Sequence, residues 1–145
     1  MRLIFKRLRE DAQLPRRATS GSAGYDLCAC ISENVRVEPG EIVRIPTGIA
    51  AALDTAEAAL FIYARSGLAS KFGVTLANCV GVVDSDYRGE IIVPIINLGQ
   101  QAYIIESGQR IAQMVAAPVF LPQVEEADDL PETARGSGGF GSTGV

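Results

Sequence analysis

The residues that could carry chemistry in this sequence gather in five short clusters. Four of them, residues 22–27, 64–69, 81–90 and 108–115, combine glycine with Asp, Arg, Ser or Gln. The fifth, residues 135–144, is half glycine but also holds one arginine, one aromatic ring and three hydroxyl side chains. Each cluster alone has an ordinary structural explanation, such as a turn, a solvated hairpin tip or a surface ion pair.

The absence of histidine removes several kinds of active site. It excludes a Ser–His or Cys–His hydrolase, a His-ligated zinc site and the zinc-deaminase pattern. Any catalysis must therefore use carboxylates, arginines and backbone amides, with or without a metal ion that prefers oxygen ligands. The three cysteines, Cys28, Cys30 and Cys79, are too few and odd in number for a disulfide framework, and they favour a reducing, cytoplasmic location. Cys28 and Cys30 are expected to be small apolar residues of a strand rather than a redox pair.

Length and charge limit the class of protein further. The chain has 145 residues, 48% of them hydrophobic, which suits one folded domain. Five of its seventeen acids lie in residues 118–134, which leaves twelve acids against thirteen bases elsewhere. With no basic surplus, nucleic acid is not an expected partner, although a few arginines could hold a small anion. The chain has no apolar run long enough to span a membrane, and its start turns charged too early for a signal peptide.

The elements that must position these clusters are expected to be short strands separated by Gly, Pro and Asn. The predicted strands are residues 3–7, 25–30, 34–37, 41–53, 58–64, 75–79, 89–97, 101–105 and 110–119. A break signal, Pro46-Thr47-Gly48, falls inside the fourth of them. One helical turn is predicted at residues 66–71, capped by Ser66, while the alanines of residues 51–59 could favour a helix but are assigned to strand and loop. This spacing favours a sandwich, barrel or jelly roll over a parallel sheet.

The composition changes near residue 122, from a β-rich body to an acidic and then glycine-rich end. We therefore divide the chain into a barrel domain, residues 1–121, and a C-terminal arm, residues 122–145. A disordered end is the ordinary interpretation of such a tail. The alternative is a glycine-hinged arm that closes over a ligand, with Arg135 and backbone amides on phosphate and Phe140 over a ring.

The five clusters, in this order, resemble those of the homotrimeric deoxyuridine triphosphatases, and the resemblance covers residues 14–144. The family usually has proline where this chain has Ala64, a change expected to affect local stiffness only. The resemblance implies an all-β, jelly-roll-like β-barrel with a flexible glycine-rich C-terminal arm. It also implies a homotrimer in which one subunit supplies Asp26, Arg65, Ser66 and Gln113, a second supplies residues 78–87, and a third lends its tail.

The resemblance further implies how the phosphates and the metal would be held. Arg65 and Arg135 would clamp phosphate oxygens, a task that suits the guanidinium fork. Ser66, Gly67 and Gln113 would add neutral donors to the phosphates. Asp26 would hold Mg²⁺ through water, because Mg²⁺ prefers oxygen ligands and keeps several waters.

The remaining implied roles concern the reaction and the choice of nucleotide. Asp84 would position and deprotonate the water that attacks the α-phosphate of dUTP, giving dUMP and pyrophosphate. Asn78, with the backbone near Val83, would pair with uracil. Tyr87 would stack on deoxyribose and exclude a 2′-hydroxyl. The tail residues implied to bind substrate are Arg135, Phe140, Gly141 and Ser142.

Two other functions compete with this expectation. A deoxycytidine triphosphate deaminase shares the fold and much of the nucleotide grip, but the complete tail and the spacing of Asp84 and Tyr87 favour the pyrophosphatase. A non-catalytic nucleotide sensor would bind a partner protein through its trimer surface. The presence of Asp84, Arg65 and Arg135 favours the enzyme over the sensor.

Overall fold

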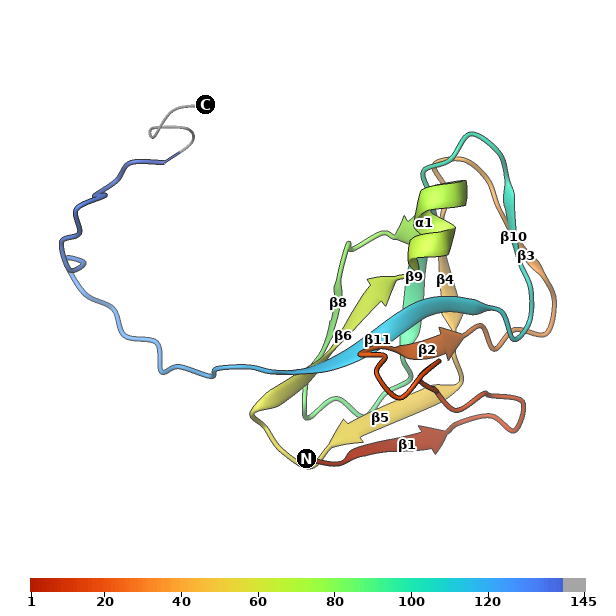
Figure 1. Ribbon diagram of the computed structural model, residues 1–145, viewed down its shortest axis with the longest axis horizontal. Coiled ribbons are helices and arrows are strands. Elements are labelled where there is room, and N and C mark those ends of the chain that lie inside the picture. Colours follow the sequence, from red (N-terminus) through yellow and green to blue (C-terminus); the bar gives the residue numbers. More distant parts are fainter. Residues whose placement is uncertain (140–145) are drawn as a thin grey trace.

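The computed structural model describes residues 1–139, which form a mostly β body and an extended arm (Figure 1). Eleven strands and one short helix lie in these residues. They are β1 (Leu3–Arg7), β2 (Tyr25–Cys28), β3 (Val35–Val37), β4 (Ile42–Pro46), β5 (Ile49–Leu53), β6 (Ala58–Ala64), α1 (Ser66–Phe72), β7 (Val74–Leu76), β8 (Gly81–Val83), β9 (Ile92–Asn97), β10 (Tyr103–Ile105) and β11 (Arg110–Pro118). Within the described part, no helix is long and apolar enough to cross a membrane.

Two sheets and two ladders make up the body. The larger sheet has the order β2-β11-β6-β8 and the second has the order β4-β9-β7. The ladders pair β1 with β5 and β3 with β10, and every pairing in the body is antiparallel. Strands that neighbour each other in space are often distant in sequence, as β2 and β11 are. The predicted all-β class is confirmed, together with its one short helix.

The hydrophobic core receives side chains from both sheets. Leu27, Leu60 and Met114 of the larger sheet belong to the same buried cluster as Ile45 and Val93 of the second sheet. None of the five is more than 2% exposed. Burial of such aliphatic side chains supplies most of the favourable free energy of folding. The core therefore fixes the two sheets against each other and gives the site residues a rigid support.

A glycine divides what the sequence presented as one long strand. Gly48 has φ of 66°, and a Cβ at this position would lie 2.6 Å from the Ala12 Cβ and 2.8 Å from the Cys30 Sγ. Only glycine tolerates both the positive φ and the close approach. The chain therefore turns between β4 and β5. The prediction of a single strand over residues 41–53 is wrong, whereas the break signal inside it is confirmed.

One whole strand escaped the sequence prediction. Residues Gly81–Val83 form β8, which pairs with β6 in the register Leu60↔Val83 and Phe61↔Val82. Three residues carry too little periodicity to predict a strand alone, so its β conformation depends on β6. In contrast, residues 3–7 and 58–64 form strands as predicted, and residues 51–59 form strand and loop rather than helix.

The helix is confirmed but its predicted cap is wrong. α1 begins at Ser66, which is therefore a helical residue, and the N-cap position falls on Arg65 without a side-chain cap hydrogen bond. At the other end Gly73 adopts a left-handed conformation with φ of 70°, and its N–H donates to the Ala69 carbonyl at 3.1 Å. A glycine at this position is a common way to end a helix.

Asn97 ties β9 to its surroundings through a buried amide. Its side chain is fully buried, yet its Nδ2 donates to the carbonyls of Val37 at 3.0 Å and Gln101 at 2.8 Å. Its Oδ1 accepts the Gly99 N–H at 2.9 Å. One side chain thus connects β3, the end of β9 and the turn that leads to β10.

Replacing Asn97 by alanine is expected to lower the free energy of unfolding by about 2–4 kcal/mol, because three hydrogen bonds are lost and buried backbone groups lose their partners. Denaturant unfolding at a fixed protein concentration measures this change. The control is Asn34→Ala, since Asn34 is exposed and should change stability by only about 0.5 kcal/mol. Equal midpoints for the two variants would contradict the role given to Asn97.

The segment after β11, residues 119–139, contains no strand or helix; it holds the described part of the arm and leaves the body beyond β11 (Figure 1). It exposes large apolar side chains: Phe120 and Val124 are 97% and 98% exposed. Contiguous exposed apolar residues mark surfaces that bind a partner. Near the described end, Arg135 lies in a turn in which its Nε donates to the Gly138 carbonyl at 2.8 Å.

Candidate functional site

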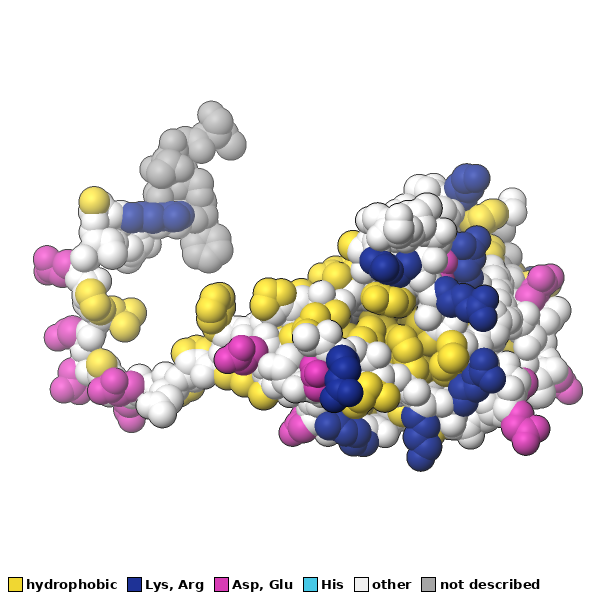
Figure 2. Space-filling model, turned by 60° about the horizontal axis from the view of Figure 1, so that its bottom comes forward, with side chains coloured by type: hydrophobic (Ala, Val, Ile, Leu, Met, Phe, Trp, Pro, Cys, Tyr) yellow, Lys and Arg dark blue, Asp and Glu magenta, His cyan; other side chains and the backbone are white. Residues whose placement is uncertain are grey.

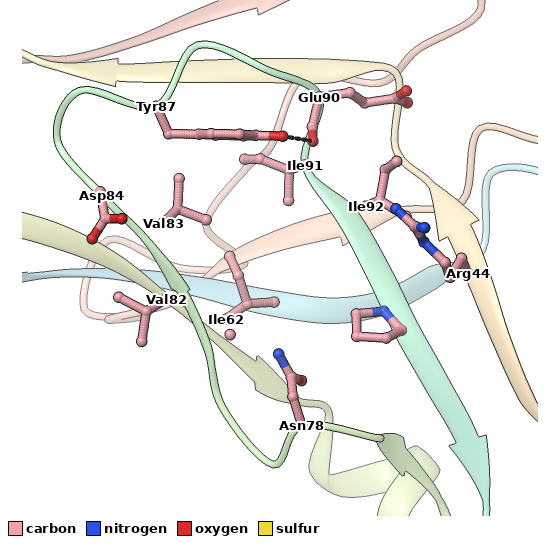
Figure 3. Close-up of a pocket in the computed structure, with 12 residues that line it drawn as sticks. Arg44, Ile62, Asn78, Val82, Val83, Asp84, Tyr87, Glu90, Ile91 and Ile92 are labelled. Atoms are coloured by element: carbon pink, nitrogen blue, oxygen red, sulfur yellow. Dashed lines mark hydrogen bonds between the residues drawn. The ribbon is translucent and has the colours of Figure 1, made fainter.

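One pocket lies against the predicted cluster at residues 81–90 (Figure 3). This hairpin pocket has a volume of 250 Å³, and its lining residues are Arg44, Ile62, Asn78, Gly81, Val82, Val83, Asp84, Tyr87, Glu90, Ile91, Ile92 and Pro94. The lining is mostly apolar with a few polar groups, as in many ligand sites. The volume lies below the range of about 300–1,000 Å³ common for whole ligands. The pocket therefore suits one ring system rather than a complete nucleotide.

Tyr87 forms a wall of the hairpin pocket, and its hydroxyl group is held by a hydrogen bond. Its hydroxyl donates to the Glu90 carbonyl at 3.0 Å (Figure 3). The ring lies so close to Gly89 that a Cβ there would come within 2.3 Å of the Tyr87 oxygen. The Glu90 carboxylate in turn accepts the Gly48 N–H at 2.7 Å. Tyr87 is 44% exposed and is therefore not a core aromatic.

Asn78 and Asp84 bring polar groups to the same pocket. Figure 3 shows the Asn78 amide and the Asp84 carboxylate separated by apolar side chains that include Val83. Asp84 directly follows β8, and its carbonyl accepts the Tyr87 N–H at 3.1 Å, which closes the turn. The Asp84 side chain is exposed and forms no ion pair within residues 1–139. It is thus available to a water molecule or a ligand.

The three cysteines are free thiols in different surroundings. Cys30 is buried, Cys28 is half-buried and Cys79 is exposed beside Asn78. Burial raises the pKa of the Cys28 thiol, and the Asp26 carboxylate raises it further. Burial also raises the pKa of Cys30, whose thiol donates to Asp11 Oδ1 at 3.4 Å. Both findings agree with the expectation that Cys28 and Cys30 are structural.

Cys79 is expected to react with iodoacetamide about tenfold or more faster than Cys28 and Cys30 near pH 8, because the thiolate is the nucleophile and access decides the rate. Timed labelling followed by peptide mass spectrometry gives the three rates. In denaturant all three should react alike, which serves as the control. Equal rates in the folded protein would show that the surroundings do not protect Cys28 and Cys30.

The second pocket brings together three clusters that are distant in the sequence. This Arg65 pocket has a volume of 500 Å³, and its lining residues are Ala18, Ser22, Ala23, Gly24, Asp26, Tyr63, Arg65, Ser66, Gly67, Gln113 and Val115. Asp26, Gln113 and Tyr63 are register partners across β2, β11 and β6. Partners directly opposite on neighbouring strands place their side chains on one face. The sheet itself therefore assembles this pocket.

Asp26 is held between two guanidinium groups. Its Oδ1 lies 3.0 Å from the Arg65 Nε and its Oδ2 lies 3.1 Å from an Arg110 terminal nitrogen. The side chain of Asp26 is 18% exposed, so the pairing balances a carboxylate that is largely removed from water. Because Arg65 uses its Nε, its two terminal nitrogens can still bind an oxyanion. An ion pair was the ordinary structural explanation of Arg65 in the sequence, but its partner Asp26 and the pair with Arg110 were not predicted.

Gln113 is fixed by its neighbours on both sides. Its Nε2 donates to the Ala64 carbonyl at 3.0 Å. A Cβ on Gly24 would lie 2.6 Å from the Gln113 Oε1, so glycine at position 24 gives the amide its space. Since the Ala64 contact is made by the backbone carbonyl, the alanine that stands where the family usually has proline does not remove it. Next along the chain, the first turn of α1 can offer the backbone N–H groups of Ser66 and Gly67.

The Arg65 pocket could hold a metal ion only through water molecules and a bound ligand, not through direct protein ligands. No group of three or more His, Cys, Asp or Glu side chains within residues 1–139 could hold a metal. Asp26 is one carboxylate, and both of its oxygens already face guanidinium groups. This donor set suits a Mg²⁺ ion that keeps its waters and takes its direct ligands from a bound polyphosphate.

The two pockets open on opposite faces of the larger sheet. Ile62 lines the hairpin pocket, and the next residue of β6, Tyr63, lines the Arg65 pocket. Successive side chains of a strand point to opposite faces of its sheet. Asp84 and Arg65 of one chain therefore belong to different faces.

The structure distributes the predicted site residues over three places. Asn78, Val83, Asp84 and Tyr87 lie in the hairpin pocket, and Asp26, Arg65, Ser66, Gly67 and Gln113 lie in the Arg65 pocket. Arg135 lies on the arm and lines neither pocket. Phe140, Gly141 and Ser142 lie outside the described residues. Glu90, Gly89 and Gly24 lie within the predicted clusters, but their supporting contacts were not predicted because these contacts leave no signal in spacing or composition.

Comparison with known proteins agrees with this architecture. The family model described as dUTPase matches residues 10–144. The deoxyuridine 5′-triphosphate nucleotidohydrolase of Desulfitobacterium hafniense is 52% identical over 145 residues, covering 100% of this chain and 96% of that protein. The corresponding protein of Hahella chejuensis is 48% identical, with 100% and 95% covered.

A solved structure gives the same result for the fold. A mutant dUTPase of Staphylococcus bacteriophage 80alpha, described with dUpNHpp, superposes with a TM-score of 0.89 at 27% identity, covering 99% of each chain. The fold expected from the sequence resemblance is thereby confirmed. On the family match, the full-length relatives and the shared fold, this chain belongs to the dUTPase family, the deoxyuridine 5′-triphosphate nucleotidohydrolases.

Proposed function

We propose that this chain hydrolyses dUTP to dUMP and pyrophosphate at a site shared between subunits of a homotrimer. The observation that carries the proposal is the division of the site residues between two pockets on opposite faces of one sheet. One pocket offers a carboxylate, an amide and an aromatic ring, and the other offers a guanidinium and neutral donors. A nucleoside triphosphate needs both sets. The reaction would supply dUMP for dTMP synthesis and limit the incorporation of uracil into DNA.

The Arg65 pocket would bind the phosphate chain. The terminal nitrogens of Arg65 suit two phosphate oxygens, while its Nε stays 3.0 Å from Asp26 and fixes the plane of the guanidinium. Gln113, Ser66 and Gly67 would add uncharged donors. When bound with the nucleotide, Mg²⁺ would neutralise part of the phosphate charge, and Asp26 would contact its waters.

The hairpin pocket of a second subunit would bind the nucleoside and the attacking water. Asn78 and the backbone near Val83 would pair with the uracil edge, and a tight turn there would reject the 5-methyl group of thymine by collision. Tyr87, held by Glu90 and backed by Gly89, would stack on deoxyribose. Asp84 would orient the water for in-line attack on the α-phosphate and accept its proton. In a loose transition state, positioning and charge neutralisation dominate over the basicity of the carboxylate.

The arm of a third subunit would complete the site. Its exposed apolar residues, such as Phe120 and Val124, would pack against another copy. Arg135 would then reach the phosphates, and Phe140, Gly141 and Ser142 would close over the nucleotide. Residues 1–121 and 122–145 thus act as a barrel domain and an arm. The proposal includes the cytoplasmic location expected from the sequence, where the three free thiols would stay reduced.

A turnover panel with dUTP, dCTP, dTTP and UTP tests the activity. Pyrophosphate should appear with dUTP and fall sharply with the other three nucleotides. Ammonia release from dCTP would instead support the deaminase, and dUTP turnover no faster than in buffer would support the sensor. Light scattering should give a mass near three times the 15.3 kDa of the chain. An active monomer would overturn the shared site.

Mixed trimers of two inactive variants test the sharing directly. In a co-expressed pair of Arg65→Ala and Asp84→Asn chains, random assembly leaves about a quarter of the sites with both residues intact if they come from different subunits. The mixed protein should therefore recover activity at roughly that fraction of wild type. Activity equal to the mean of the two parents would show that Arg65 and Asp84 act within one chain.

A further inference from the structure

A third pocket near the start of β11 has a surplus of positive charge. This arginine pocket has a volume of 560 Å³. Its charged lining residues are Arg7, Glu10, Arg16, Arg17, Asp26 and Arg110. Four guanidinium groups thus face two carboxylates, although the body as a whole is nearly neutral.

Three of these arginines have no acidic partner within residues 1–139, and two of the three, Arg7 and Arg16, also form no side-chain hydrogen bond there. Asp26 is already shared by Arg65 and Arg110. Arg17 donates to the Ser20 carbonyl at 3.0 Å and lies 5.7 Å from the centre of the Tyr25 ring. Arg7 and Arg16 form no ion pair within residues 1–139. The pocket therefore presents two unpaired cations to an anionic partner.

The arm carries the complementary charge. Its five carboxylates, all exposed and none in an ion pair within the described part of the chain, are Glu125, Glu126, Asp128, Asp129 and Glu132. Between residues 118 and 134 there is no basic residue to balance them. In the view of Figure 2, dark blue side chains lie on the body, together with some magenta ones, and magenta side chains follow the arm.

We propose that the arginine pocket of one subunit is the docking site for the acidic segment, residues 125–132, of another copy's arm. The inference rests on the proposed function, in which Arg135 of the arm reaches the phosphates in the Arg65 pocket. The arginine pocket and the Arg65 pocket are neighbours, because both are lined by Ala18 and Asp26.

The length of the chain makes this placement possible. Glu132 precedes Arg135 by three residues and Asp129 precedes it by six. Extended chain spans at most about 3.5 Å per residue, so these carboxylates stay within about 10 and 20 Å of Arg135. When Arg135 is at the phosphates, the acidic segment is therefore long enough to reach the adjoining arginine pocket.

The arm that docks belongs to another copy. β11 begins at Arg110, which lines the arginine pocket, and ends after nine residues at Pro118, shortly before the arm. A strand of this length spans about 30 Å. The arm therefore leaves its own body at the end of β11 far from its own arginine pocket, and it extends further away (Figure 1).

Docking would also reduce the repulsion between the acidic segment and the triphosphate. Five carboxylates brought toward a triphosphate would repel it unless cations neutralise them. Arg7 and Arg16 supply those cations beside the phosphate site. Holding the acidic segment there raises the effective concentration of Arg135 and the glycine-rich tail at the nucleotide.

Charge reversal in the pocket tests the docking. Arg7→Glu combined with Arg16→Glu should raise KM for dUTP about 3–30-fold with a much smaller change in kcat, as expected for two partly exposed ion pairs. High salt should reduce the difference from wild type, because it screens these pairs. The matched control is Arg36→Glu, an exposed arginine of β3 that pairs with Glu38 and should leave KM unchanged. An unchanged KM in the pocket variant would overturn the proposal.

Reversal on both sides should restore the pairing. Adding Asp129→Arg and Glu132→Arg to the pocket variant should bring KM back to within about threefold of wild type. Failure of this rescue would contradict docking. Pyrophosphate inhibition of dUTP turnover gives a further check. If Arg7→Glu with Arg16→Glu weakens this inhibition while Asp129→Arg with Glu132→Arg alone does not, the pocket binds a small anion and the proposal is wrong.

A disulfide experiment separates docking from activity. In a full-length Cys79→Ser background, Gln13→Cys in the pocket and Asp129→Cys on the arm should form a reducible link between chains, and dUpNHpp should increase it. Asn34→Cys paired with Asp129→Cys is the control and should not link. Linkage without dUTP turnover would support docking while the proposed function fails, and turnover without linkage would leave the function standing and overturn docking.

Discussion

Asp84→Asn is expected to lower kcat for dUTP by about 10²–10⁴, the usual contribution of a positioned acid or base, while KM stays within a few-fold of wild type. Asparagine has nearly the same shape, and the turn is closed by the Asp84 carbonyl rather than its side chain. The amide can still orient a water but cannot accept its proton. Pyrophosphate release gives kcat, and calorimetry with a non-hydrolysable dUTP analogue gives the affinity.

The hairpin offers a matched control for this variant. Asp86 lies two residues further on in the same turn and is also exposed, but it does not line the hairpin pocket. Asp86→Asn removes the same charge and should keep nearly normal turnover. If Asp84→Asn keeps near-normal turnover, or if both variants lose activity equally, Asp84 is not the residue that acts on the water.

The strand pattern could be predicted where turn residues and β-branched runs agree. Residues 3–7 and 58–64 have their predicted bounds because each is bordered by polar or turn-forming sequence. β8 could not be predicted, since three residues at Gly81–Val83 become a strand only through pairing with β6. The split between β4 and β5 depends on how closely Ala12 and Cys30 approach Gly48, and local sequence does not report such contacts.

The sequence located the site residues but not their arrangement. Clusters rich in Gly, Asp and Arg indicated which side chains carry chemistry. Whether they meet depends on register: Asp26 and Gln113 meet because β2 and β11 pair at those positions, although 86 positions separate them. Ile62 and Tyr63 are consecutive, yet they line different pockets. Long-range pairing and the alternation of one strand thus decide what the clusters can do.

Arg65 shows why the arrangement of the site residues, and not only their identity, matters for the mechanism. From the sequence it is a phosphate clamp, and in the structure it is also the ion-pair partner of Asp26. The two roles are compatible because the Nε serves Asp26 and the terminal nitrogens remain for phosphate. The two roles can be separated by experiment. Only for a phosphate clamp should the loss of affinity on replacing Arg65 depend on the number of phosphates on the ligand.

Arg65→Ala is expected to lower kcat/KM for dUTP by about 10²–10⁴, because hydrogen bonds to charged groups contribute about 1.5–3 kcal/mol each and the guanidinium can form two of them. Arg65→Lys should lose less, about tenfold, since it keeps the charge without the fork. The control is Arg36→Ala, which removes an exposed arginine outside all three pockets.

The dependence on phosphate number identifies the role of Arg65. If its terminal nitrogens bind the phosphate chain, Arg65→Ala should weaken a non-hydrolysable dUTP analogue far more than dUMP, because dUMP lacks the β- and γ-phosphates. If Arg65 only holds Asp26, both ligands should weaken alike, and Asp26→Asn should add nothing to the loss in Arg65→Ala. Because Asp26 pairs with Arg110 through its other oxygen, it should keep its place when Arg65 is removed. The clamp therefore predicts a selective loss of triphosphate affinity.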